Sequence, residues 1–108
     1  MPIFKDFDFN LLRSMEVFSA VVETRHITQA AKLLGMTQSA ASQHIHSLEQ
    51  ALGAELIDRS VRPIRITLAG IALYQRSSRI FTEIEESITE VRRLDGNITP
   101  VLLSLIHI

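Results

Sequence analysis

Hydrogen-bonding side chains recur at helical spacing in one stretch that carries few charges: Gln38, Ser39, Ser42, Gln43 and His46. A helix face that is merely solvated more often carries Glu and Lys. A face that lies against base edges needs amides and hydroxyls, because Gln pairs with adenine and Ser serves either base. We therefore interpret these residues as a candidate surface for contacting nucleic-acid bases. The alternative is a polar surface helix that happens to lack charge.

The chain around this face is patterned as two helices joined by a tight turn, from Ile27 to Glu49. Thr28 is placed to cap the first helix and Thr37 to cap the second, since a hydroxyl at such a position accepts a backbone N–H of the first turn. Gly35 falls between them, where the chain needs a residue that tolerates positive φ. Two helices joined so closely predict a helix-turn-helix, which places its second helix in the major groove of DNA.

Apolar residues at helical spacing predict a small three-helix core. In the second helix of the motif the stripe is Ala41, Ile45, Leu48 and Leu52. Upstream, Asn10 is placed to cap a further helix that runs to about Thr24. Its stripe is Leu11, Met15, Phe18 and Val22, widened by Leu12 and Val21. Each stripe lies on one helix face, so the three helices are expected to cover one another.

After Gly53 the pattern predicts a two-stranded wing. Residues 54–58 form a short extended segment, residues 59–63 form a basic turn, and residues 64–66 alternate apolar and charged side chains as a half-buried strand does. Arg59 and Arg62 in the turn are candidate DNA contacts, and a guanidinium near the tip could enter a minor groove. The alternative is a plain surface hairpin with solvated arginines.

A long amphipathic helix is predicted next, capped by Thr67 and ended near Gly96. Its apolar stripe is nearly heptad and comprises Leu73, Ile80, Ile84, Ile88 and Val91. A helix of this length outruns the small domain and must bury its stripe elsewhere. A second copy of the chain is the simplest partner, and domains outside this chain are the alternative.

Length and composition limit the remaining possibilities. The 108 residues suit one small domain with an extension. We expect a winged DNA-binding domain over residues 1–66, a linker helix over 67–95, and a tail over 96–108 that begins a further domain or was added artificially. The net charge is −1, but residues 25–65 carry +2, so a local basic patch suits phosphate contact. The absence of cysteine, of a membrane-length apolar run and of a signal peptide fits a cytoplasmic location.

Two other classes of protein are alternatives to a DNA-binding domain. An enzyme would need a site built around His26, His44 or His46, but no third metal ligand, phosphate loop or nucleophile with its base accompanies them. We therefore expect surface histidines, no catalysis, no metal and no cofactor. A structural dimer or adaptor, with the long helix as its only function, would leave the polar face without a role.

Several of these pieces together resemble the N-terminal DNA-binding domain of LysR-type transcriptional regulators. The resemblance covers about Phe9 to Leu94 and rests on FSAVVETRHITQAAKLLGMTQSAASQHIHSLEQALGAELIDRS and RPIRITLAG. It implies a mainly α, winged helix-turn-helix fold followed by a dimerising linker helix. It also implies a transcription regulator that binds an operator as a homodimer, with a higher oligomer open to a longer protein. A small-molecule effector would act only through a C-terminal sensor domain absent here.

The resemblance also assigns roles to particular residues. Five positions match those where family members touch the operator: Thr37, Gln38, Ser39, Ser42 and Gln43. Arg62 matches the wing arginine, and Thr28 matches a cap whose helix end approaches a phosphate. Family members often carry Arg or Lys at the positions of Gln43 and His46, so this chain should have a weaker phosphate contribution to binding. Ala41 replaces a larger aliphatic residue, which indicates looser packing.

Overall fold

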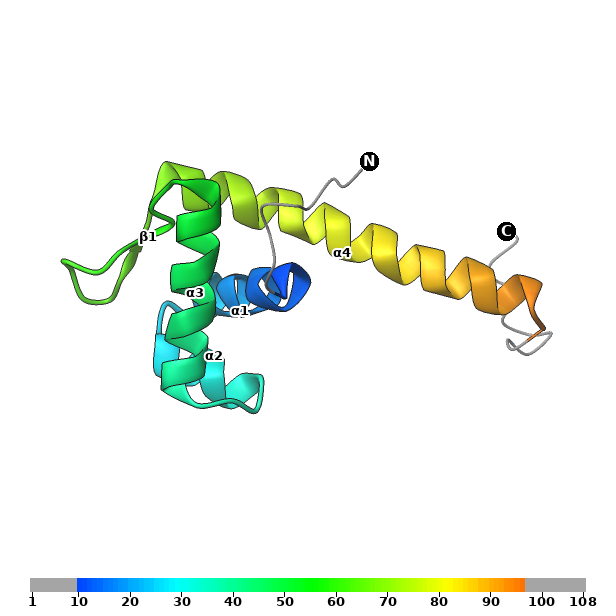
Figure 1. Ribbon diagram of the computed structural model, residues 1–108, viewed down its shortest axis with the longest axis horizontal. Coiled ribbons are helices and arrows are strands. Elements are labelled where there is room, and N and C mark those ends of the chain that lie inside the picture. The colour runs from blue at the N-terminus through cyan, green and yellow to red at the C-terminus, as the bar shows by residue number, and fades with distance from the viewer. Residues whose placement is uncertain (1–9, 97–108) are drawn as a thin grey trace. The chain divides into compact units, whose positions relative to one another are not determined.

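The computed structural model describes residues 10–96, and the tail predicted at 96–108 lies outside this range except for Gly96. The described chain forms four helices and one two-stranded hairpin (Figure 1). It falls into two compact units that meet within the last helix, after Ser77.

Helix α1 spans Leu11–Thr24 and begins where the sequence predicts. The Asn10 side chain accepts the backbone N–H of Arg13 at 3.1 Å, which caps the first turn. The helix ends at Arg25, which takes a left-handed conformation and donates its backbone N–H to Val21 O at 2.7 Å. Its buried face is broader than the predicted stripe and comprises Ser14, Met15, Val17, Phe18, Ala20 and Val21. Leu12, predicted to widen that stripe, is 47% exposed instead.

Helices α2 (Ile27–Leu33) and α3 (Gln38–Leu52) form the predicted helix-turn-helix, joined through Gly35 at φ +67°. Ala30 and Ala31 of α2 are buried, and small residues there allow α1 and α3 to approach closely. From α3 the core receives Ala41, Ile45 and Leu48, each with no exposed surface. Leu52, predicted for the same stripe, is 41% exposed because it stands in the last turn, beyond the three-helix core.

The wing consists of two short antiparallel strands, β1 (Ile57–Asp58) and β2 (Arg65–Ile66), with Ile57 opposite Ile66. Its inward side chains, Leu56, Ile57, Ile64 and Ile66, are buried, while Arg65 is exposed. This is the alternation that the sequence predicts for a half-buried strand. The Arg62–Pro63 peptide bond in the turn is cis.

Helix α4 spans Leu68–Leu94 and is anchored to the wing at its start. The Thr67 hydroxyl accepts the backbone N–H of Gly70 at 3.0 Å, the predicted cap, and donates to the carbonyl of Glu55 at 2.6 Å. Gly70 packs against the Leu56 carbonyl and the Ile66 side chain, where a Cβ would clash with backbone. Glycine at this position therefore permits α4 to start directly on the wing.

The apolar stripe predicted for α4 is largely open to solvent. Ile80, Ile88 and Val91 are 39%, 46% and 65% exposed. Leu73 and Ile84 are half-buried. The helix ends at Gly96, which has φ +75° and donates its backbone N–H to the carbonyl of Arg93.

Candidate nucleic-acid interface

The N-terminal cap of α3 fixes where the polar face of this helix begins. Thr37 has extended backbone geometry, and its side chain accepts the backbone N–H of Ala40 at 3.1 Å. The carbonyl of Thr37 accepts the N–H of Ala41 at 3.0 Å, so the helix starts at Gln38. The cap thereby sets which side chains turn outward and which turn to the core.

Five predicted site residues share one outward face of α3. Gln38, Ser39, Gln43 and His46 are exposed, and Ser42 is half-buried. Together with Arg59 from the wing they line one shallow depression of about 570 Å³. The structure therefore brings together six of the nine predicted DNA contacts, from two elements that are separated in the sequence. The face is amide- and hydroxyl-rich, with Arg59 at its edge.

Gln43 and Arg59 are already held by neighbouring groups. The Gln43 side-chain amide donates to the Ser47 hydroxyl at 3.3 Å, one turn further along α3. The Arg59 guanidinium pairs with the Glu49 carboxylate at 3.4 Å. That carboxylate also accepts the backbone N–H groups of Leu56 and Ile57, so Glu49 joins α3 to the wing.

Thr28 does not cap α2 as predicted. The cap position belongs to His26, whose side chain makes no capping hydrogen bond, and the helix starts at Ile27. Thr24 takes part of the capping role, because its hydroxyl accepts the backbone N–H of His26 at 3.2 Å and donates to the carbonyl of the same residue at 3.0 Å. Thr28 stands half-buried within the first turn and lines a separate cleft.

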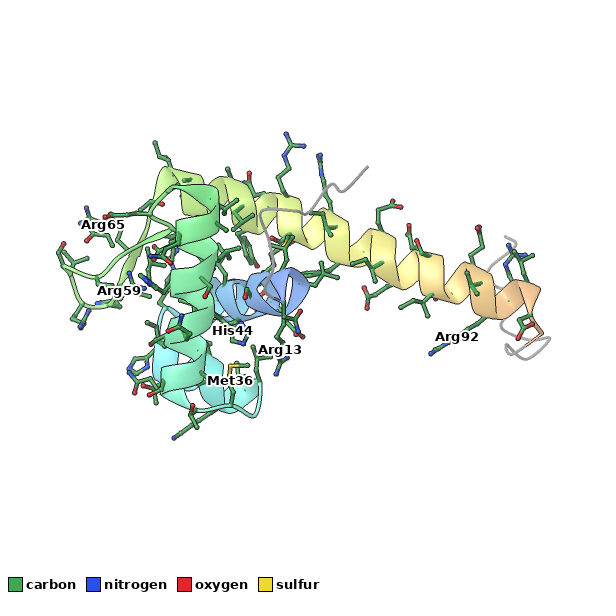
Figure 2. The ribbon with its side chains drawn as sticks, in the orientation of Figure 1. Arg13, Met36, His44, Arg59, Arg65 and Arg92 are labelled. Atoms are coloured by element: carbon green, nitrogen blue, oxygen red, sulfur yellow. The ribbon has the colours of Figure 1, made fainter. Side chains whose placement is uncertain are left out.

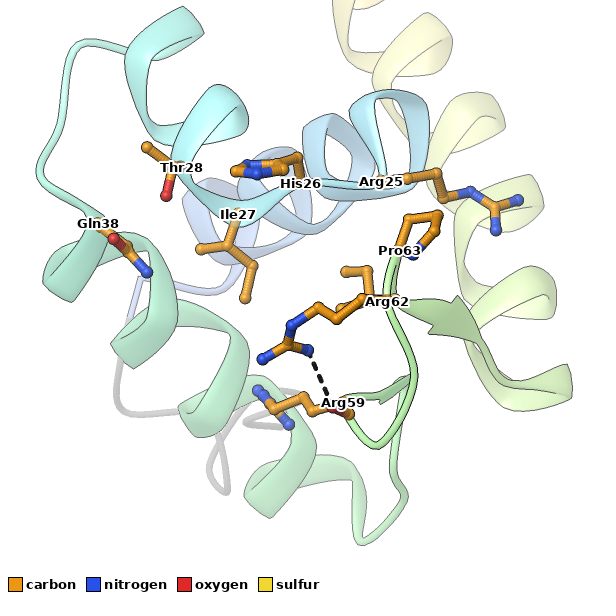
Figure 3. Close-up of a pocket in the computed structure, with 9 residues that line it drawn as sticks. Arg25, His26, Ile27, Thr28, Gln38, Arg59, Arg62 and Pro63 are labelled. Atoms are coloured by element: carbon orange, nitrogen blue, oxygen red, sulfur yellow. Dashed lines mark hydrogen bonds between the residues drawn. The ribbon is translucent and has the colours of Figure 1, made fainter.

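That cleft lies between the start of α2 and the wing and has a volume of about 170 Å³ (Figure 3). Its lining residues are Arg25, His26, Ile27, Thr28, Gln38, Arg59, Arg62, Pro63 and Ile64. Gln38 and Thr28 stand at one end of the view in Figure 3, and Arg25 and Pro63 stand at the other. The Arg62 guanidinium reaches back from the turn and donates to the carbonyl of Arg59 at 2.9 Å.

Arg25 and His26 were not among the predicted site residues. From the sequence alone, Arg25 contributes only to the regional positive charge, and His26 is only a histidine without a full set of metal ligands. Nothing in the local pattern indicated that they face the wing, because this proximity arises from the fold. The one feature of the sequence that could have marked Arg25 and His26 as site residues is their position directly before the first helix of the helix-turn-helix.

His44 differs from the surface histidine expected from sequence. It is half-buried, and its Nδ1 lies 2.8 Å from the hydroxyl of Ser14, which is completely buried on α1. Figure 2 shows His44 on the side of α3 that faces α1. His46, two residues further on, lies exposed on the polar face. The two histidines thus occupy different faces of α3, as their spacing predicts.

The turn of the wing is ordered by a carboxylate. Asp58 accepts both the hydroxyl of Ser60, at 2.6 Å, and its backbone N–H, at 2.9 Å. These two hydrogen bonds hold the pKa of the Asp58 carboxyl below its usual range. The bond from the Ser60 hydroxyl lowers it most, the bond from the Ser60 backbone N–H lowers it less, and the charge of Arg65 makes a smaller contribution. The chain thereby turns directly after β1, toward Arg62.

Within residues 10–96 no group of three or more His, Asp or Glu side chains is arranged to hold a metal ion. In the same part of the chain no helix is long and apolar enough to cross a membrane.

The three-helix core, the outward polar face of α3 and the hairpin beside it define a winged helix-turn-helix protein. Residues 12–71 match the family described as bacterial regulatory helix-turn-helix protein, lysR family. This chain belongs to that family.

Two relatives illustrate the similarity in sequence. One is an uncharacterized HTH-type transcriptional regulator in the ibpB-leuC intergenic region of Azotobacter vinelandii, 39% identical over 88 residues, which cover 82% of this chain and 61% of that protein. The other is the HTH-type transcriptional regulator BudR of Klebsiella aerogenes, 37% identical over 92 residues, which cover 82% of this chain and 64% of BudR. The chain thus spans less than two thirds of the length of either relative.

The fold is also that of a solved protein–DNA complex. The BenM DNA-binding domain in complex with catB site 1 DNA superposes with a TM-score of 0.75 at 32% identity, over 78% of this chain and 94% of that domain. The observed fold class therefore agrees with the resemblance drawn from the sequence.

Proposed function

We propose that this chain is the sequence-specific DNA-binding part of a transcription regulator. One observation carries the proposal: the α3 face of Gln38, Ser39, Ser42, Gln43 and His46 forms a single exposed surface with Arg59 of the wing. Amides and hydroxyls on a protruding helix suit the donors and acceptors of the major groove. The presence of DNA on the similar BenM domain supports the same use of the fold.

The recognition helix α3 and the wing receive different roles in this proposal. The α3 side chains contact base edges and set sequence preference, whereas Arg59 and Arg62 contact the backbone or the minor groove and add affinity for every sequence. Thr37 is assigned to the DNA-facing end of α3, and Thr28 to the cleft beside it. Thr28 acts through its own hydroxyl rather than through a helix cap.

We further propose that two copies pair through α4 and bind an operator with dyad symmetry. The stripe of Leu73, Ile80, Ile84, Ile88 and Val91 supports pairing, because Ile80, Ile88 and Val91 are each at least 39% exposed. Fully burying an exposed side chain of this kind is worth roughly 1.5–3 kcal/mol, and covering the exposed part of each contributes a fraction of that. Dimers of helix-turn-helix domains match their two-fold axis to that of the site.

The remaining parts of the proposal concern the longer protein and its location. This chain spans less than two thirds of the length of the two relatives, which supports a separate effector domain in the longer protein. We assign any response to a small molecule to that domain. We place the protein in the bacterial cytoplasm with its DNA. We assign it no enzymatic activity, since the named relatives are regulators.

Fluorescence anisotropy on a labelled random duplex tests the proposal against a purely structural adaptor. Binding that is tight near 50 mM salt and weakens steeply by about 200 mM is expected, because contacts to phosphates release counterions. The adaptor alternative predicts a dimer without measurable DNA affinity at either salt concentration. That result would exclude the proposed function.

A further inference from the structure

A DNA strand must pass between α3 and the wing if both elements bind as proposed. The sugar–phosphate backbone separates the major groove from the minor groove. With α3 in the major groove and the wing turn at the adjacent minor groove, one backbone segment lies between them. The cleft between Gln38 and the residues 59–64 of the wing occupies this position.

The lining of this cleft is chemically matched to that segment. Ile27, Pro63 and Ile64 are apolar surfaces suited to a deoxyribose ring, while Arg25, His26 and Arg62 supply donors suited to phosphate oxygens. A volume of about 170 Å³ admits a sugar–phosphate unit and is too small for the deep burial of a large ligand. Figure 3 shows the Ile27 side chain directed into the space toward Arg62.

The cationic groups of the cleft have spare capacity for an anion. Arg59 is paired with Glu49. By contrast, neither Arg25 nor Arg62 forms an ion pair with any residue of the described range 10–96. The Arg25 Nε donates to the carbonyl of Val22 at 3.1 Å, which fixes the base of the guanidinium at the outer end of the cleft. Its remaining N–H groups are available for a phosphate.

We infer that this cleft seats one sugar–phosphate segment of the operator, and that Arg25 and His26 are phosphate contacts. This inference rests on the proposed function and extends it to two residues outside the helix face and the wing turn. Because phosphates are common to all sequences, Arg25 and His26 add affinity without adding sequence preference.

The test compares Arg25→Gln, and the double variant Arg25→Gln with His26→Gln, with the control Arg76→Gln. Arg76 is an exposed arginine of α4 that does not line the cleft, so the control removes the same charge elsewhere. A glutamine at position 25 keeps the backbone N–H that donates to the Val21 carbonyl. It must adopt the same left-handed backbone conformation as the arginine that it replaces. Circular dichroism of each variant verifies the fold.

Binding is measured against duplexes selected by the wild-type chain and against scrambled ones. Arg25→Gln should lower the slope of log K against log salt by about 0.9, since one phosphate contact is lost. The double variant should bind both duplexes about tenfold more weakly, with their affinity ratio unchanged. Arg76→Gln should match the wild type.

Three outcomes separate the inference from its alternatives. The inference is overturned, and the proposed function stands, if the wild-type chain prefers its selected duplex while Arg25→Gln and Arg76→Gln bind DNA with the same affinity and salt dependence. A wild-type chain that binds no duplex overturns the proposed function itself. A changed ratio of affinities for the selected and scrambled duplexes in Arg25→Gln would mark a base contact and also overturn the inference.

Discussion

The carboxylate of Glu49 in α3 accepts the backbone N–H of Leu56 at 2.8 Å, directly before the first wing strand. The same oxygen lies 3.4 Å from the N–H of Ile57, and the other oxygen pairs with Arg59. The side chain of Glu49 is only 12% exposed. One residue of the proposed recognition helix therefore sets the position of the wing relative to the base-contacting face.

Removing this carboxylate should destabilise the domain. Glu49→Ala leaves the N–H groups of Leu56 and Ile57 without their acceptor, and we expect a loss of about 1–3 kcal/mol in the free energy of unfolding. Urea unfolding followed by circular dichroism measures it. Glu49→Gln is the matched control, because its amide oxygen still accepts a hydrogen bond, and it should lose less. An unchanged midpoint for Glu49→Ala would show that the wing is positioned by other contacts.

The second prediction concerns sequence preference. Gln43 is exposed on the proposed base-contacting face, and its side-chain amide donates to the Ser47 hydroxyl within α3. Gln43→Ala should cost about 1–3 kcal/mol at the selected site and relax preference at one or two base pairs. Gln75→Ala, on the exposed surface of α4, makes the same change away from this face. If Gln43→Ala leaves the ratio of specific to random binding unchanged, the residue does not contact bases.

The third prediction concerns pairing through α4. Ile84→Glu puts a charge near the middle of the apolar stripe, where an interface would bury it at a desolvation cost. We expect monomers with an intact fold that bind single half-sites weakly and lose the avidity of the full site. Thr82→Glu adds a charge on the exposed polar side of the same helix and should remain dimeric. Analytical ultracentrifugation distinguishes them, and an Ile84→Glu variant that still dimerises would exclude the proposed interface.

The fourth prediction uses the single tyrosine of the chain. The Tyr74 hydroxyl donates to the Glu23 carboxylate at 2.9 Å, and this hydrogen bond raises the pKa of Tyr74 above its usual value, with smaller contributions from burial and from the Glu23 charge. The sequence has no tryptophan, so ultraviolet absorbance titration reports Tyr74 directly. Glu23→Ala removes the acceptor and should return the pKa toward its usual value, while Glu16→Ala should not. A pKa unaffected by Glu23→Ala would contradict the assigned cause.

The sign of the accompanying effect on stability follows from this direction. The folded-state pKa of Tyr74 is raised, so the protonated form binds its partner better in the folded state. Its contribution is fully present below the pKa of an unfolded tyrosine and is lost as the pH rises through the folded-state pKa. Stability should therefore fall in the alkaline range, and this fall should be smaller for Glu23→Ala.

Local patterns in the sequence predicted the elements well. Asn10, Thr37 and Thr67 cap the helices for which they were predicted, because a hydroxyl or amide before a helix acts on its own first turn. The alternation of Ile64, Arg65 and Ile66 likewise predicted the second wing strand. Such features depend on residues within a few positions of one another.

Other outcomes depend on contacts that no cap or periodicity pattern shows. Thr28 matched the cap pattern, but Thr24 of α1 already binds the backbone of His26, and α2 starts one residue before Thr28. The pairing of Arg59 with Glu49 of α3 is not visible in the local pattern either. The closeness of Arg25 to the wing could not be predicted either, since no local pattern relates positions almost forty residues apart.

Selection of bound sites from a random duplex pool tests the central claim most directly. Sequencing the DNA retained by the chain should give one enriched motif with dyad symmetry, its half-site centres about one or more helical turns apart. Two copies of the α3 face, related by a two-fold axis, produce this symmetry. A pool without enrichment, or an enriched motif without dyad symmetry, would contradict sequence-specific binding by a symmetric dimer.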